Sequence, residues 1–153
     1  VIYDNYEKEF RGTYSGYVRP IINKLLSSYC KKLLGIEQQV IDNSDDFFTV
    51  SQQIRQVLSE HCKDRTIVSC CWGHLDWLLW DENARRNNQT SPFSGVPLID
   101  LMSSSADLLD IGEETVEREI VRRKLGLTPP IQAHDALEDA KELARIFALL
   151  SDP

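Results

Sequence analysis

The stretch that decides the fold is RTIVSCCWGHLDWLLW, residues 65–80. Its first half is a short apolar run with β-branched residues, and Gly73 closes it, as is typical of a buried strand. Its second half carries apolar residues behind an acid, which predicts a helix over residues 76–83. A buried strand that leads directly into a helix is the building unit of an α/β domain.

Strands and helices alternate on both sides of this stretch. Strands are expected, from β-branched and aromatic runs, over residues 1–3, 10–20, 65–73 and 97–102. Helices are expected, from apolar residues at three- and four-residue steps, over residues 25–34, 48–61, 76–83, 114–125 and 137–150. No repeat, linker or change in composition divides the chain. One α/β domain over residues 1–153 is therefore predicted.

The composition is that of a globular protein with an excess of acids. Hydrophobic residues make up 42% of the 153 residues and charged residues 27%, which suffices for a core. The net charge of −7 argues against a protein that coats nucleic acid through bulk electrostatics. It does not exclude a nucleic-acid enzyme whose acids hold metal ions.

Hydropathy and cysteine usage indicate a compartment. No apolar run reaches transmembrane length, and no basic-then-apolar signal peptide opens the chain, so no membrane association is expected. Cys30, Cys62, Cys70 and Cys71 form no C-x-x-C pair, and the last two lie inside an apolar run. Buried thiols of this kind predict a reducing, cytoplasmic setting.

One acid follows the buried strand. Asp76 falls at the start of the helix expected over residues 76–83, and in open α/β sheets ligands bind beyond the carboxyl ends of the strands. An acid at this place suits a metal ion or a substrate. The alternative is that Asp76 only caps the helix.

A histidine and a second acid mark the start of the last helix. In PPIQAHDALEDAKELARIFALL, residues 129–150, the tandem proline stops the preceding element and Asp135 is a good candidate N-cap. His134 then lies in the entry loop and Asp139 about one turn into the helix, so both side chains can reach a common point. The alternative is that His134 is an unengaged surface residue.

Together, Asp76, His134 and Asp139 suit one kind of chemistry. Carboxylate oxygens are ligands for Mg²⁺ or Mn²⁺, and two such ions can clamp the attacking and leaving oxygens of a phosphodiester. A neutral histidine can take the proton from the attacking water. The three residues therefore indicate metal-dependent hydrolysis of a phosphodiester.

The same residues resemble two motifs of the DEDDh 3′–5′ exonucleases, the proofreading-exonuclease superfamily with an RNase H-like fold. HDALEDA, residues 134–140, is similar to the third motif, in which the histidine is the general base and the acid five residues on is a metal ligand. CWGHLDWLL, residues 71–79, is similar to the second motif, whose aspartate, here Asp76, binds metal. The resemblance implies that Asp139 is a metal ligand and His134 the general base.

Three further segments resemble the Eri-type subgroup of this superfamily. They are YVRPIINKLLSSYCKKLLGIEQQVID (residues 17–42), PLIDLM (97–102) and RRKLGL (122–127). The ordered set covers nearly the whole chain. It implies an RNase H-like mixed sheet flanked by helices, and it favours RNA over DNA as substrate.

The resemblance leaves one motif unaccounted for. The family begins with a central strand that carries D-x-E and supplies two of four metal-binding acids, and nothing in this chain fits it. Asp4 and Glu7 are three residues apart and fall on the hairpin that follows that strand in the family. We favour the interpretation that the motif lies upstream of Val1 and that the exonuclease domain is N-terminally incomplete. The alternative is a catalytically dead relative.

A zinc site is a weaker interpretation of other residues. The residues in question are His61, Cys62, Cys70, Cys71 and His74. Their spacing fits no common zinc finger, and strand neighbours point to opposite faces of a sheet. A structural zinc ion is therefore not expected.

Basic and aromatic residues have a structural and a functional interpretation. Arg85 and Arg86, and the run that ends at Lys124, are expected on solvated helix faces, with contact to phosphates as the alternative. Three tryptophans could stack on bases. Core packing is the expected use of at least two of these tryptophans. The three are Trp72, Trp77 and Trp80.

The sequence therefore predicts an exonuclease that releases 5′-mononucleotides from the 3′ end of single-stranded RNA or DNA. Asp76 and Asp139 would hold Mg²⁺ or Mn²⁺, His134 would activate water, and upstream acids would complete a two-metal site. The alternative is an inactive exonuclease-like domain that binds nucleic acid or protein. No substrate-binding residue and no oligomeric state are predicted.

Overall fold

A computed structural model describes residues 1–112, 116–129 and 135–152. The strands are β1 (Ile2–Asp4), β2 (Glu9–Gly12), β3 (Ser69–Cys71) and β4 (Leu98–Asp100). The helices are α1 (Ser28–Leu34), α2 (Gln38–Asp42), α3 (Phe47–His61), α4 (Leu75–Arg86), α5 (Leu101–Leu108), α6 (Arg118–Lys124) and α7 (Ala136–Leu150). The predicted α/β class is confirmed.

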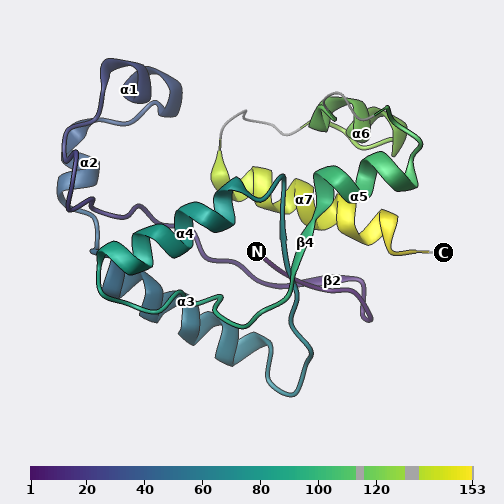
Figure 1. Cartoon of the computed structure of the whole chain (residues 1–153), viewed down its shortest axis with the longest axis horizontal. Coiled ribbons are helices and arrows are strands. Elements are labelled where there is room, and N and C mark those ends of the chain that lie inside the picture. Colours follow the sequence, from purple (N-terminus) through teal and green to yellow (C-terminus); the bar gives the residue numbers. More distant parts are fainter. Residues whose placement is uncertain (113–115, 130–134, 153) are drawn as a thin grey trace.

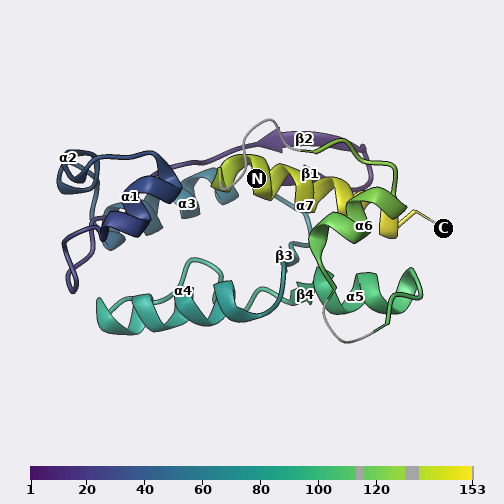
Figure 2. The same cartoon turned by 90° about the horizontal axis from the view of Figure 1, so that it is seen from above.

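The strands form two separate pairs. β1 and β2 are antiparallel, with Tyr3 opposite Phe10, whereas β3 and β4 are parallel, with Cys70 opposite Ile99. The two pairs overlap in the view of Figure 1, and Figure 2 shows them apart, with β2 at one side of the molecule and β4 towards the other. In the described ranges, β1 pairs only with β2 and β3 only with β4, so one edge of each strand has no partner.

A cavity lies between these two unpaired edges. Its volume is about 520 Å³, and β1, β3, α3 and α7 all contribute to its wall. Among the lining side chains are Ile2, Cys70, Leu58 and Phe147. The two strand pairs are therefore separated by a cavity whose wall is mostly apolar.

Three predicted strands were too long. The strand expected over residues 97–102 is limited to β4, because α5 begins at Leu101. The strand expected over residues 10–20 ends at Gly12, after which the chain makes only an isolated bridge from Val18 to Asp45. The strand expected over residues 65–73 is limited to β3. The physical reason is the same for these last two strands, because a strand persists only where a neighbour pairs with it, and β1 and β4 have three residues each.

Helix boundaries also differ from the prediction. α4 continues three residues beyond position 83, and α2 and α5 were not predicted at all. α6 starts at Arg118 rather than at 114, although residues 113–115 lie outside the described ranges. Ser27 caps α1, and Asp135, the expected N-cap, accepts hydrogen bonds from two backbone N–H groups of α7, which confirms the predicted start of that helix.

The best-packed core lies between α5, α6 and α7. Val121 on α6 and Ile146 on α7 are fully buried, at 0% exposure each, and they form one cluster with Ala106 and Val116, which are 9% and 5% exposed. Four other residues of α7, Ala140, Leu143, Ala144 and Phe147, line the cavity, and Leu143 also packs against the core. α7 therefore packs on one side and borders the cavity on the other.

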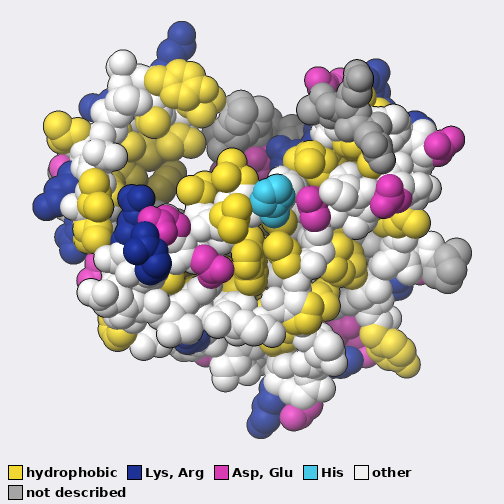
Figure 3. Space-filling model, viewed as in Figure 1, with side chains coloured by type: hydrophobic (Ala, Val, Ile, Leu, Met, Phe, Trp, Pro, Cys, Tyr) yellow, Lys and Arg dark blue, Asp and Glu magenta, His cyan; other side chains and the backbone are white. Residues whose placement is uncertain are grey.

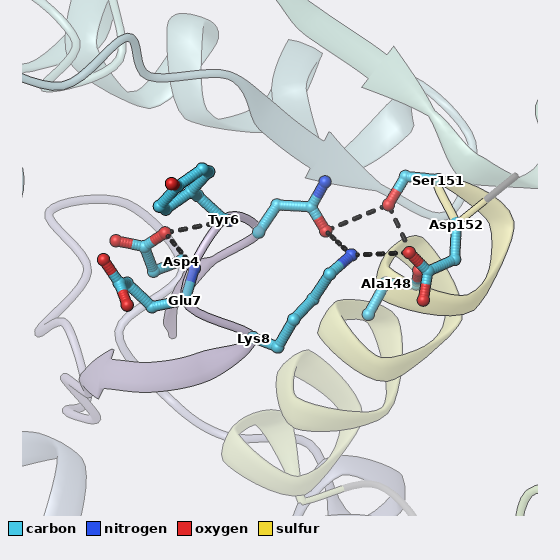
Figure 4. A network of polar contacts seen from close by, with 8 residues as sticks. Asp4, Tyr6, Glu7, Lys8, Ala148, Ser151 and Asp152 are labelled. Carbon is cyan, nitrogen blue, oxygen red and sulfur yellow. Dashed lines mark hydrogen bonds and ion pairs between the residues drawn. The ribbon is translucent and has the colours of Figure 1, made fainter.

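The hairpin of β1 and β2 is tied to the end of α7 (Figure 4). Lys8 Nζ lies 3.0 Å from Asp152 Oδ1, and the Ser151 hydroxyl donates to Asn5 Oδ1 at 3.0 Å. Within the turn, the backbone N–H of Glu7 donates to the Asp4 carboxylate and lowers its pKa. The first and last elements of the described chain are thus joined by polar contacts.

No helix among the described residues combines the length and the apolar composition that a membrane span needs.

Candidate active site

A short turn connects β3 to α4, the helix that carries Asp76. Gly73 adopts a left-handed conformation with φ +76°, which glycine tolerates without a steric penalty. Its backbone N–H donates to Asp100 Oδ1 at 2.9 Å, so an acid at the end of β4 holds the turn that follows β3. His74 is the N-cap residue of α4, and Asp76 lies exposed in the first helical turn.

The interpretation of Asp76 as a helix cap is wrong. The N-cap position belongs to His74, and no side chain caps α4 by a hydrogen bond. The Asp76 carboxylate is also not engaged by any described hydrogen-bond donor or cation. The pKa of the nearby Cys71 thiol is raised, first by burial and then by the negative charges of Asp100 and Asp76. Asp76 is therefore a carboxylate open to a ligand.

Asp139 lies in the first turn of α7 and is held by a cation. Arg118 Nη2 on α6 donates to Asp139 Oδ1 at 2.9 Å. The second oxygen of Asp139 receives no hydrogen bond from the described residues. Both acids thus stand at the beginning of a helix, one at α4 and one at α7, and Figure 1 shows these two helix starts.

Glu142, one turn further along α7, forms a buried ion-pair cluster with α6. It is 3% exposed, and its Oε1 accepts from Arg122 Nη1 at 3.0 Å. Arg118 Nε lies 3.1 Å from Glu142 Oε2 but without the alignment of a hydrogen bond, so that contact is chiefly electrostatic. The cluster ties α6 to the turn of α7 that carries Asp139.

His134 lies outside the described residues, so its role as general base stays a prediction. Asp76 and Asp139 supply oxygen donors, which are the ligands that Mg²⁺ and Mn²⁺ prefer. Within residues 1–112, 116–129 and 135–152, however, no three or more His, Cys, Asp or Glu side chains gather where they could hold a metal ion. The described acids therefore fit part of a metal site and do not close it.

The zinc interpretation finds no support in the part of the chain that the structure describes. No metal-holding group of histidines and cysteines is present there, and all four cysteines are free thiols. Burial, with a contribution from Cys71, raises the pKa of Cys70 to about 11. A raised thiol pKa disfavours the thiolate that would bind zinc.

The tryptophans are used in packing. Trp80 lies with its ring centroid 5.3 Å from that of Phe47 and 5.4 Å from that of Phe93, and Trp77 lies 5.7 Å from Phe93. Trp72 packs against the core between α5, α6 and α7. The expectation that at least two tryptophans serve the core is confirmed.

The surface beside Asp76 is apolar. Leu75, Leu78 and Leu79 of α4 are more than half exposed, at 63%, 53% and 51%. Figure 3 shows hydrophobic side chains gathered in the middle of the face in view, close to acidic ones. A hollow separates them from the part of the chain around α1 and α2. The run of leucines after Asp76 therefore belongs to an open face rather than to the core.

The basic residues singled out in the sequence fall into two groups. Arg85 and Arg86 both pair with Glu82, at 2.7 Å and 2.6 Å, on an exposed helix face, as predicted. Arg118 and Arg122 instead hold acids of α7. Sequence reasoning missed these contacts because α6 and α7 meet only in the folded chain.

Asp100 was also missed, although the sequence held a signal for it. It follows a strand and precedes α5, which is the pattern of an N-cap, and it accepts from Met102 N at 2.9 Å. The same oxygen accepts from Gly73 N, so this cap also positions the turn before Asp76.

Known proteins match this chain along most of its length. A model of the exonuclease family, RNase T, matches residues 1–147. The 3′-5′ exoribonuclease 1 of Rattus norvegicus is 26% identical over 152 residues, covering 95% of this chain and 43% of that protein. The human 3′-5′ exoribonuclease 1 is 27% identical over 153 residues, with the same coverage. The chain thus spans less than half the length of these relatives.

Solved structures show the same fold. The nuclease domain of 3′hExo, described as a DEDDh family member bound to rAMP, superposes with a TM-score of 0.85 at 24% identity, covering 95% of this chain and 74% of that one. A 3′-exonuclease in a structure of 3′-end recognition of the histone mRNA stem-loop has a TM-score of 0.83 at 26% identity, covering 94% and 51%. The family match over residues 1–147 shows that the chain belongs to the exonuclease family, and its fold is that of the nuclease domain described as a DEDDh family member.

Proposed function

We propose that the protein is a metal-dependent 3′–5′ exonuclease that acts on single-stranded RNA and releases 5′-mononucleotides. The observation that carries this proposal is the placement of Asp76 and Asp139 in the first turns of α4 and α7, with neither carboxylate used as a helix cap. RNA is favoured over DNA because the similar solved nucleases were bound to rAMP and to a histone mRNA stem-loop.

The proposal assigns a role to each of three residues. Asp76 and Asp139 hold divalent metal, Mg²⁺ or Mn²⁺, which supplies a Lewis acid for the phosphodiester. His134 accepts the proton of the attacking water, for which its imidazole must be neutral. The open position of Asp76 and the fixed position of Asp139 suit a site that grips only a terminal nucleotide.

We further propose that a segment preceding residue 1 completes the domain. It would enter the cavity between β1 and β3 as a strand and join the two pairs into one sheet. The cavity wall is mostly apolar, and its two strand edges are unpaired among the described residues. The D-x-E motif expected on that strand would add two acids to Asp76 and Asp139.

A cytoplasmic location is part of the same proposal. The four cysteines are free, and the adjacent pair Cys70 and Cys71 lies in β3 beside the cavity. Four cysteines without a disulfide are typical of a protein in a reducing compartment.

The test uses the full-length protein and RNA labelled at its 5′ end. We expect shortening from the 3′ end, 5′-mononucleotides as products, dependence on Mg²⁺ or Mn²⁺ and loss of activity with chelator. Cleavage of a circular RNA, or activity that persists in chelator, would contradict the proposal. Binding of RNA without turnover would favour the inactive binding module instead.

A further inference from the structure

Arg118 on α6 reaches two acids of α7 at once. Its Nη2 donates to Asp139 Oδ1 at 2.9 Å, and its Nε lies 3.1 Å from Glu142 Oε2. The guanidinium is planar and holds its donors in a fixed fork, so one arginine can bridge two carboxylates with defined geometry. The orientation of the Asp139 carboxylate is therefore tied to α6.

Glu142 in turn fixes Arg118. The Glu142 side chain is 4% exposed and also pairs with Arg122, which is 15% exposed, at 3.0 Å. Two arginines against one buried carboxylate leave one positive charge, and Asp139 balances it. The four side chains form a neutral cluster, and Arg118 is the member that connects its buried part to the proposed metal ligand.

We infer that Arg118 is a positioning residue for Asp139. By binding one carboxylate oxygen, it leaves the other directed and available, so the metal meets an oriented ligand. This inference rests on the proposed function, since it assumes that Asp139 binds metal. Partners that hydrogen-bond a ligating carboxylate contribute roughly 10–100-fold to metal affinity or activity.

The chain offers a matched control. Arg122 lies on the same helix, one turn away, and pairs with the same Glu142, but among the described residues it forms no hydrogen bond or ion pair with Asp139. In either single variant, Glu142 keeps one arginine, so neither leaves a buried charge without a partner. A role that is merely structural would be shared by both arginines, whereas positioning of Asp139 belongs to Arg118 alone.

The experiment measures Mn²⁺ affinity of the full-length protein by electron paramagnetic resonance. Arg118→Met should bind Mn²⁺ roughly tenfold more weakly than the parent, and Arg122→Met should stay close to it. Arg118→Lys keeps a charge near Asp139 but loses the bridge, so its affinity should fall between those of the parent and Arg118→Met. Thermal unfolding should show a similar loss of stability for both methionine variants.

The outcomes separate the two proposals. Equal Mn²⁺ affinities for Arg118→Met and Arg122→Met would overturn the positioning role. Tighter binding by Arg118→Met would also overturn it, because Arg118 would then compete with the metal. If the parent protein itself binds no Mn²⁺, the proposed metal site fails, and the inference fails with it.

Discussion

The two faces of α7 differ in how completely the described chain covers them. On one face Ile146 is fully buried against the core and Glu142 is 3% exposed beside α6. On the other face Ala144 and Phe147 line a cavity of about 520 Å³. Both faces belong to one helix, so helix propensity cannot explain the difference. The side towards α6 is covered by the described residues, whereas the side towards β1 and β3 borders a cavity.

The proposed active site draws on both regions. Asp139 lies one turn before Glu142, on the side of α7 that Arg118 holds. Asp76 follows β3, whose Cys70 lines the cavity. The proposed site would therefore join an acid from the side of α6 to an acid from the side of the cavity. Changing each acid separately tests whether the two regions act as one site.

The largest effect is expected for the acids. Asp76→Asn and Asp139→Asn keep the shape of the side chain but remove the charge that the metal needs, so each should abolish turnover and weaken metal binding. Turnover and Mn²⁺ affinity of the full-length variants are the measurements. An active Asp76→Asn enzyme would show that the site does not extend to the cavity side.

His134 should behave differently from both acids. His134→Ala removes the proposed base without removing a metal ligand, so the rate should fall by roughly a hundred- to ten-thousandfold, while Mn²⁺ affinity stays close to that of the parent. A variant as active as the parent would make His134 a bystander and would deprive the assigned mechanism of its base.

A smaller effect is expected when side chains on the two faces of α7 are truncated, because the loss of stability should differ between the faces. Ile146→Ala, in the core beside α6, should lower the free energy of unfolding by about 3 kcal/mol, within the usual range for such a truncation. Phe147→Ala removes a larger side chain but borders the cavity, so in the 153-residue chain its cost should be smaller. Urea unfolding of both variants measures the difference.

Restoring the upstream segment sharpens that comparison. If a strand fills the cavity, Phe147 gains neighbours and the cost of Phe147→Ala should rise, whereas the cost of Ile146→Ala should not change. Equal costs for Phe147→Ala in the short and full-length proteins would show that the segment packs elsewhere.

Local patterns predicted the elements on which the site depends. The apolar run closed by Gly73 gave β3 and the start of α4, and Asp135 gave the start of α7. Each of these signals acts within a few residues of the element that it marks. Asp76 and Asp139 could therefore be placed at helix starts before their surroundings were known.

Contacts between distant segments could not be predicted in this way. Strand length depends on a partner, which is why the strand expected over residues 10–20 shrinks to β2. The bridge from Arg118 to Asp139 and Glu142 depends on how α6 meets α7, and no spacing in the sequence encodes it. α5 was missed because a strand and a helix follow each other there without a loop, at Asp100 and Leu101.

The smallest expected effect comes from Cys70, in the wall of the cavity. Burial raises the pKa of its thiol from an ordinary 9.0 to about 11, with a further contribution from Cys71. Between these two values the unfolded chain loses the thiol proton while the folded protein keeps it. The unfolded state then binds fewer protons, so the free energy of unfolding should fall as the pH rises through this window.

Urea unfolding of the parent and of Cys70→Ala over the same pH window measures this contribution. The parent should lose more stability than Cys70→Ala as the pH rises, because both proteins keep Cys71 and only the parent carries the Cys70 thiol. Parallel curves would show that Cys70 is not held in a desolvated place, and the cavity between β1 and β3 would then be open to water. A strand that fills the cavity should bury the thiol further, so the full-length protein should show the steeper fall.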